Sequence, residues 1–97
     1  MATGEEPPLR IVVTSQQYEK DAKRVRSRGK DMARLVAIVD ALRNRRPVAP
    51  RHRDHALVGD WRGYRECHIQ ADWLLIYRID EQTLSLARTG SHSDLFG

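Results

Sequence analysis

One segment, residues 73–79, constrains the fold of this chain more than any other. Its first five residues are all apolar, and the first polar side chain is Arg78. A half-exposed strand alternates apolar and polar side chains, so a strand without that alternation is expected to be covered on both faces. In a chain of 97 residues this predicts a central strand in a small sheet that other elements cover.

Further strands are predicted on both sides of this segment. Residues 63–69 and residues 83–88 have strand-like composition, and the turns between the strands fall at Asp72 and at residues 80–82. Consecutive strands joined by short turns form an antiparallel meander. Residues 9–13 are a short β-branched run that predicts one more strand near the start of the chain.

Two helices are predicted between the first strand and the meander. Ser15 is a suitable N-cap for the first helix, and Gly29 is well placed to end it. Asp31 caps the second helix, and residues 44–53, with two prolines, form a loop. Apolar residues recur at helical spacing, at Tyr18, Ala22 and Val25 in the first helix and at Met32, Leu35, Val36, Val39 and Leu42 in the second. The predicted fold is therefore α+β with the order β-α-α-β-β-β, an antiparallel sheet and both helices packed on one of its faces.

Length and composition predict one domain over residues 9–97, preceded by a disordered leader at residues 1–8. Hydrophobic residues make up 40% of the chain, which is enough for one modest core. The longest apolar run is far below the roughly 20 residues of a membrane span, and the leader lacks the features of a signal peptide. Cys67 is the only cysteine, which excludes an intrachain disulfide and a CxxC zinc site. We therefore expect a cytoplasmic protein that does not enter the membrane.

The basic residues are concentrated between Lys20 and Arg53. This segment holds twelve lysines and arginines and three aspartates, whereas the whole chain has a net charge of only +4. A basic segment on a small domain is typical of a polyanion partner, most often a nucleic acid. Two alternatives stay open, namely an acidic protein partner and helix faces that are simply solvated.

All four histidines lie in the second half of the chain, together with residues suited to acid–base chemistry. His68 and Asp72 flank one predicted turn, and Arg88 and His92 lie four residues apart at the end of the last strand. This set suits cleavage of RNA by its own 2′-hydroxyl. In that reaction a base removes the hydroxyl proton, a guanidinium stabilises the phosphorane and an acid protonates the leaving oxygen. The reaction needs no metal or other cofactor.

Each of these residues also has an ordinary structural interpretation. Trp73 and Phe96 offer stacking surfaces for unpaired bases, but Trp73 begins an apolar run and suits the core equally well. Arg88 is compatible with an ordinary surface position. A metal site is disfavoured because the spacing of its candidate ligands matches no tight motif. Those ligands are His52, His55, Cys67 and Asp72.

Three blocks of sequence, in order and with matching gaps, resemble the YafQ-type toxins of bacterial type II toxin–antitoxin systems. The blocks are residues 54–68 (DHALVGDWRGYRECH), 72–77 (DWLLIY) and 88–96 (RTGSHSDLF), with shorter matches at residues 18–21 and 28–31. The resemblance covers residues 9–97. The chain departs from the pattern at Gln70 and Ala71, where relatives often have an acidic residue and a proline, and His52 lies outside the motif.

The resemblance implies a RelE/ParE-like fold and a ribosome-dependent endoribonuclease that cleaves mRNA and halts translation. It implies that His55, His68, Asp72, Arg88 and His92 form the active site. Our hypothesis for their roles is that His92 is the general acid and that His68, oriented by Asp72 or sharing work with it, is the general base. Arg88 then stabilises the phosphorane, and His55 supports the phosphate or the base. No metal is implied. The implied substrate contacts are Trp73, Phe96 and Arg65.

The resemblance also implies the partners of the chain. These are a cognate antitoxin that neutralises the toxin, the ribosome with its mRNA, and operator DNA bound only through the toxin–antitoxin complex. The basic segment is then expected to contact ribosomal RNA or to receive the antitoxin. Three alternatives stay open. They are a non-enzymatic ParE-like toxin that binds a protein such as DNA gyrase, an inactive relic that serves its antitoxin in binding DNA, and a ribonuclease that needs no ribosome.

Overall fold

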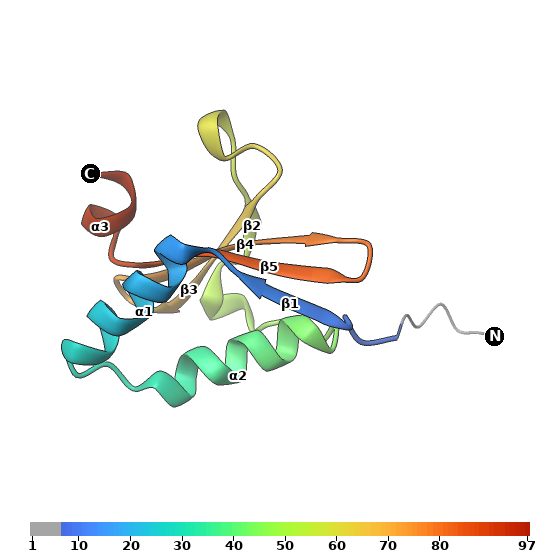
Figure 1. Ribbon diagram of the computed structural model, residues 1–97, viewed down its shortest axis with the longest axis horizontal. Coiled ribbons are helices and arrows are strands. Elements are labelled where there is room, and N and C mark those ends of the chain that lie inside the picture. The colour runs from blue at the N-terminus through green and yellow to red at the C-terminus, as the bar shows by residue number, and fades with distance from the viewer. Residues whose placement is uncertain (1–6) are drawn as a thin grey trace.

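The computed structural model describes residues 7–97, and these form the predicted α+β fold (Figure 1). The predicted disordered leader falls largely on residues 1–6, which lie outside the described part of the chain. The β-α-α-β-β-β order is confirmed. The structure adds one short strand, one short α-helix and two 3₁₀ helices, all too short to produce periodicity in the sequence. In chain order the elements are β1 (Ile11–Thr14), α1 (Gln16–Ser27), α2 (Met32–Arg43), the 3₁₀ helix η1 (Pro50–His52), β2 (His55–Ala56), the 3₁₀ helix η2 (Gly59–Trp61), β3 (Arg65–Gln70), β4 (Trp73–Asp80), β5 (Thr83–Gly90) and α3 (His92–Phe96).

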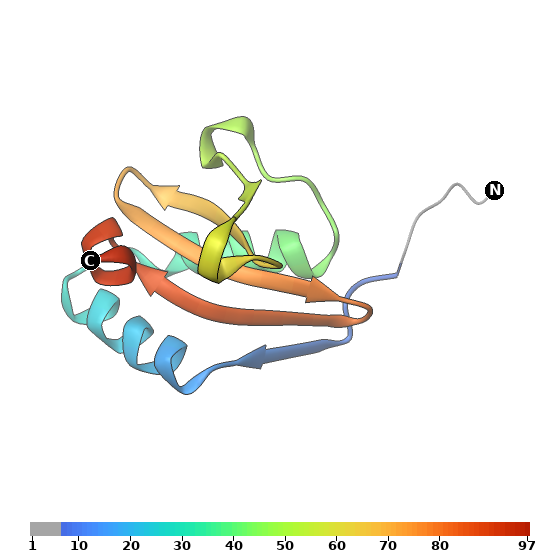
Figure 2. The same cartoon turned by 90° about the horizontal axis from the view of Figure 1, so that it is seen from above.

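The sheet has five strands in the order β1-β5-β4-β3-β2, so β4 is central as predicted (Figure 2). Strands β3, β4 and β5 form the predicted antiparallel meander. Strand β1, however, pairs with β5 in parallel, with Ile11 opposite Thr83, so the expectation of a wholly antiparallel sheet is wrong. The chain between β1 and β5 runs from residue 15 to residue 82 and includes both helices and strands β2 to β4. This connection is long enough for parallel pairing, which a short turn does not allow.

The predicted caps set the boundaries of the two long helices. Ser15 Oγ accepts the Tyr18 N–H at 2.9 Å, and Asp31 Oδ1 accepts the Ala33 N–H at 3.1 Å. Gly29 has a φ of 83°, a left-handed conformation that glycine adopts at low cost after a helix end. An N-cap bond typically contributes about 1 kcal/mol, so these residues decide where α1 and α2 begin.

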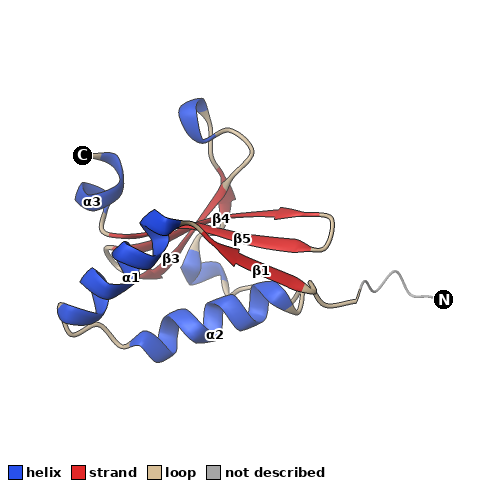
Figure 3. Ribbon diagram, in the orientation of Figure 1, coloured by secondary structure: helices blue, strands red, loops and turns tan. Residues whose placement is uncertain are grey.

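The buried side of α2 differs from the prediction. Leu35, Ile38 and Leu42 are buried, whereas Val36, which was expected on the apolar face, is 65% exposed. Helices α1 and α2 cover the same face of the sheet (Figure 3), and this packing selects the strip of α2 that meets the core. The sequence alone does not separate the two strips, because both have helical spacing.

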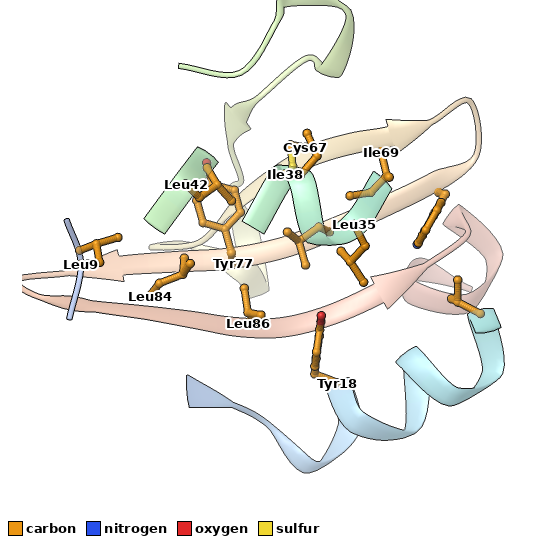
Figure 4. Close-up of a cluster of buried hydrophobic side chains, with 13 residues drawn as sticks. Leu9, Tyr18, Leu35, Ile38, Leu42, Cys67, Ile69, Tyr77, Leu84 and Leu86 are labelled. Carbon is orange, nitrogen blue, oxygen red and sulfur yellow. The ribbon is translucent and has the colours of Figure 1, made fainter. Parts of the chain in front are cut away.

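The core lies on both faces of β4, which explains its apolar sequence. On the face covered by α1 and α2, the cluster of buried side chains includes Tyr77 and Leu86 (Figure 4). On the opposite face Leu74 packs with Leu95 of α3. All side chains of residues 73–77 are buried, as predicted. Among the described helices, none is long and apolar enough to cross a membrane.

Candidate active site

The sheet face opposite α1 and α2 carries most of the predicted catalytic residues. The strand register pairs Glu66 of β3 with Ile76 of β4, and Ile76 with Arg88 of β5. Directly paired residues project from the same face of a sheet. His68 shares this face because it lies two residues after Glu66 on the same strand. One face therefore holds a histidine, a carboxylate and a guanidinium from two different strands.

Three of the four histidines gather here from three different elements. His55 belongs to β2, His68 to β3, and His92 begins α3. The ring centres of His55 and His68 are 6.5 Å apart, and those of His68 and His92 are 5.8 Å apart. The ring of Phe96 lies 6.4 Å from that of His92 and is 48% exposed. The structure therefore brings three of the predicted site histidines together, and Phe96 lies beside them.

Asp72 contacts His92 rather than His68. Its Oδ1 accepts the backbone N–H of His92 at 3.0 Å and the Nδ1–H of the ring at 2.8 Å. These two bonds hold the pKa of Asp72 below its usual value. The expectation that Asp72 orients His68 is wrong, because the turn between β3 and β4 places this carboxylate against the first residue of α3. The bond at Nδ1 leaves Nε2 as the ring nitrogen of His92 available for chemistry.

Glu66 is a site residue that the sequence motifs did not single out. It is buried, and its Oε2 lies 3.4 Å from Nε2 of both His55 and His68. The Nδ1–H of His55 donates to the carbonyl of Arg53 at 2.7 Å, which leaves Nε2 for the carboxylate. The sequence did contain a signal for Glu66. It lies two residues before His68, and residues two apart on a strand project from the same face.

Arg88 is held by a buried carboxylate of α1. Asp21 is 0% exposed and accepts from Arg88 Nε at 2.7 Å and from Nη2 at 3.2 Å. It also accepts from the Thr89 N–H and from the side chains of Gln17 and Arg24. Burial by itself raises the pKa of Asp21, but the hydrogen bonds from its donors bring that pKa below its usual value. The guanidinium is therefore oriented by a charged partner and is not an ordinary surface group.

A second carboxylate connects α3 to α1. Asp94 accepts from Arg28 Nη1 at 2.7 Å, and this bond holds the pKa of Asp94 well below its usual range. Asp94 also accepts the Ser91 N–H at 2.9 Å and so completes a capping box at the start of α3. Glycine is needed at position 90, because a Cβ there would lie 2.8 Å from Asp94 Oδ2. Helix α1 therefore anchors both the last strand and the helix that follows it.

Two residues predicted as substrate contacts do not lie in the site. Trp73 is 1% exposed, and its Nε1–H donates to Thr89 Oγ1 at 2.9 Å. The structure places Trp73 in the core, so its ring is not available as a stacking surface in this conformation. Arg65 lies on the helix-covered side of the sheet, where it pairs with Asp54 at 2.6 Å. Alternation along β3 separates it from Glu66 and the histidines.

One group of side chains in the described residues has the geometry of a metal site. Ligand atoms of Glu66, His68 and His92 all lie within 4.8 Å of one another. Imidazole and carboxylate donors together suit zinc or copper. The ligand set considered from the sequence is not assembled in this way, because Cys67 is buried in the core on the other face. Burial raises the pKa of its thiol to about 12, so Cys67 is a structural residue.

The lowered pKa values of Asp21 and Asp94 predict that the fold loses stability in acid. A carboxyl with a lower pKa in the folded state stabilises the fold above its unfolded pKa, about 3.9. This contribution is lost as the pH falls through the folded value, because the unfolded chain then binds more protons. We expect the melting temperature, followed by circular dichroism, to fall below about pH 4.

Two variants make this expectation specific. Asp94→Asn is expected to show a shallower fall in acid than the wild type, since it lacks one of the responsible carboxyls. Asp40→Asn removes an exposed carboxylate that pairs with Arg46 at the surface, and it is expected to follow the wild-type curve. Coincident profiles for Asp94→Asn and the wild type would contradict the assignment.

The sequence matches a known family over almost its whole length. Residues 10–97 match the family model described as the bacterial toxin of type II toxin-antitoxin system, YafQ. The mRNA interferase toxin YafQ of Escherichia coli strain K12 is 42% identical over 89 residues, which cover 91% of this chain and 97% of the relative.

Solved structures have the same fold. YafQ from E. coli strain BL21(DE3) is 38% identical with a TM-score of 0.87, over 91% of this chain and 99% of that one. The E. coli DinJ-YafQ toxin-antitoxin complex gives 41% identity and a TM-score of 0.85, over 92% and 99%. A metal-bound toxin from Helicobacter pylori gives 42% identity and a TM-score of 0.83, over 89% and 98%. The chain therefore belongs to the YafQ family, the bacterial toxins of type II toxin–antitoxin systems.

Proposed function

We propose that this toxin is an mRNA interferase, an endoribonuclease that cuts mRNA on the ribosome by acid–base catalysis without a metal. The observation that carries the proposal is the cluster of His55, His68 and His92 with two carboxylates on one side of the sheet. A module that only binds has no need for acids and bases gathered in this way. The E. coli relative is named an mRNA interferase toxin, which supports the same activity.

His92 is the general acid in this mechanism. Asp72 accepts from Nδ1 at 2.8 Å, so Nδ1 keeps its proton and Nε2 is the nitrogen that serves the leaving group. The Nε2–H then gives its proton to the 5′-oxygen as the bond between phosphorus and that oxygen breaks. Phe96, on the same short helix, offers an exposed ring on which a neighbouring base can stack.

His68 is the general base. Glu66 Oε2 lies 3.4 Å from Nε2 of His68, and this carboxylate favours the tautomer with the proton on Nε2. Nδ1 is then the basic nitrogen that removes the 2′-hydroxyl proton. The 2′-oxygen then attacks phosphorus, and the products are a 2′,3′-cyclic phosphate and a 5′-hydroxyl. Nε2 of His55 lies 3.4 Å from the same carboxylate oxygen, and this histidine supports the phosphate.

Arg88 stabilises the charge that develops on the phosphorane. Its Nε and Nη2 bind Asp21, which leaves Nη1 for a phosphoryl oxygen. Removing one such electrostatic stabiliser typically costs ~10²–10³ in rate.

The partners follow from this activity. A type II toxin is paired with a cognate antitoxin, and the related E. coli toxin has been solved in complex with DinJ. Most of the basic residues between Lys20 and Arg53 contact ribosomal RNA, and mRNA is the substrate. Operator DNA is bound only through the toxin–antitoxin complex. The protein acts in the cytoplasm, where the ribosomes are.

Primer extension on a reporter mRNA tests the proposal, with purified ribosomes and without them. We expect cuts only where ribosomes and wild-type toxin are both present. A chelator that removes zinc and copper but spares Mg²⁺ is expected to leave the cuts unchanged. Added Cu²⁺ or Zn²⁺ is expected to inhibit, because a metal at Glu66, His68 and His92 would occupy nitrogens that move protons.

Other outcomes favour the alternatives. Equal cutting of naked RNA would indicate a ribonuclease that needs no ribosome, and loss of cutting with the chelator would contradict the metal-free mechanism. Growth arrest without any cut would favour a ParE-like toxin that binds a protein such as DNA gyrase. Harmless expression in the absence of antitoxin would favour an inactive relic.

A further inference from the structure

We propose that a groove beside the histidine cluster binds the phosphates of mRNA next to the cleaved bond. The groove has a volume of about 640 Å³ and shares His68 and His92 with the cluster. It continues along η1 and the first turn of α2, and the residues that complete its lining are Arg34, Arg51, His52, Arg53, Ile69, Gln70 and Ala71. This inference rests on the proposed function, because it takes RNA as the substrate.

The charge of the groove fits a polyanion. Three arginines line it, and no carboxylate of the described residues does. Arg34 lies 4.0 Å from Asp31 in an exposed pair, which contributes little. Within residues 7–97, no ion pair is found for Arg51 or Arg53. Their guanidinium groups therefore remain available for the paired hydrogen bonds that arginine makes to phosphate.

His52 connects the groove to the catalytic strand. Its Nδ1 lies 2.6 Å from the backbone oxygen of His68, and a carbonyl oxygen only accepts, so Nδ1 carries the proton. This bond joins η1, and with it the backbone on either side of His52, to β3 next to His68. The family motif leaves His52 without a role, and the structure assigns it this one.

The location of the groove indicates which phosphates it binds. A strand whose reacting phosphate lies at His68 and His92 has to continue away from them in both directions. The adjoining groove is lined by the same two histidines and is basic beyond them. Phosphate contacts of this kind position a strand without reading its bases, so the groove is expected to affect affinity for mRNA and not the choice of cleavage site.

Two double variants with the same change in charge test the groove. Arg51→Gln with Arg53→Gln removes two groove arginines, whereas Arg10→Gln with Arg78→Gln removes two exposed arginines outside it. Cleavage is measured on ribosomes programmed with reporter mRNA as toxin concentration and salt are varied. The groove variant is expected to need about tenfold more toxin for half-maximal rate. The slope of log affinity against log salt concentration is expected to be shallower by about 0.7 for each phosphate that the variant no longer neutralises. Its rate at saturation is expected to stay within about twofold of the wild type, since binding alone is weakened.

Binding assays separate this inference from the proposed activity. A labelled single-stranded RNA with 2′-O-methyl groups at every position cannot be cleaved, and the groove variant is expected to bind it more weakly than the control variant. Equal affinities of the two variants, or no binding by the wild type, would overturn the proposal. If the groove variant lost as much affinity for vacant ribosomes, which hold no mRNA, as for the RNA, the groove would be assigned to ribosomal RNA. That result would overturn the proposal that it binds mRNA. If the wild type cuts no mRNA but the groove variant still loses affinity for the RNA, the proposed nuclease activity is contradicted, whereas the proposal that the groove binds RNA phosphates is retained.

Discussion

Replacing His92 with glutamine is expected to slow mRNA cleavage by ~10²–10⁴-fold, the usual contribution of a positioned acid or base. Glutamine keeps a side chain of similar length and can still hydrogen-bond to Asp72, but it has no proton to give to the leaving 5′-oxygen. The backbone N–H of residue 92, which Asp72 also accepts, is unchanged. The measurement is the rate of reporter cleavage at saturating toxin.

The fold is expected to survive this change. His92 is exposed, and the capping box that starts α3 involves Ser91 and Asp94 instead. The melting temperature should therefore stay close to that of the wild type. Ser93→Ala, at the next exposed position of α3, is the matched control and is expected to cleave at the wild-type rate. A His92→Gln toxin that cleaves within threefold of the wild type would remove His92 from the role of acid.

The elements that the sequence predicted correctly are those whose signals are local. Strand β4 was predicted from an uninterrupted apolar run, and the two long helices from capping residues that bond within three residues along the chain. Strand β2 and helix α3 span only two and five residues, which is too short for either periodicity to appear. The parallel pairing of β1 depends on where a whole crossover returns the chain, and no local signal records that.

The site shows the same division between local and distant contacts. The family resemblance singled out His55, His68 and His92, and the structure brings them together. The contact of Asp72 with His92 spans 20 residues, and the contact of Asp21 with Arg88 spans 67, so neither follows from spacing.

Alternation along β3 was a signal that could have been used further. If His68 faces the site, then Glu66 shares its face and Arg65 lies on the opposite one, as the structure shows. Trp73 had two interpretations, as a core residue and as a stacking surface for a base. Its side chain is buried although it is the first residue of its strand, because that strand is the central one.

Replacing Asp21 with asparagine is expected to slow cleavage by ~10²–10³-fold, about as much as the loss of a single electrostatic stabiliser. Asp21 lies on α1, and its link to the site is the pair of bonds to Arg88 at 2.7 and 3.2 Å. The two guanidinium nitrogens bind different oxygens of Asp21, and asparagine has only one oxygen, so it cannot reproduce this bidentate pairing. Arg88 then no longer has the orientation that presents Nη1 to the phosphate.

This variant is also expected to lose stability. Breaking a buried ion pair by removing one charge typically costs about 3–5 kcal/mol. A domain of this size has roughly 5–15 kcal/mol in total, so the variant is expected to remain folded at low temperature. Cleavage is therefore compared at about 15 °C, with circular dichroism of the same samples to confirm that α1 is intact. Asp40→Asn breaks an exposed pair with Arg46 and is expected to change neither stability nor rate noticeably.

A double-mutant cycle distinguishes positioning of Arg88 from a general weakening of the fold. If Asp21 acts through Arg88, then Asp21→Asn adds almost no further loss of rate once Arg88→Ala is present, because the group that it orients is gone. If Asp21 only stabilises the fold, the two losses multiply, and the rate of the double variant falls by the product of both factors. Strongly non-additive losses would make α1 part of the catalytic apparatus, since its buried carboxylate would then set the geometry of a guanidinium 67 residues further along the chain.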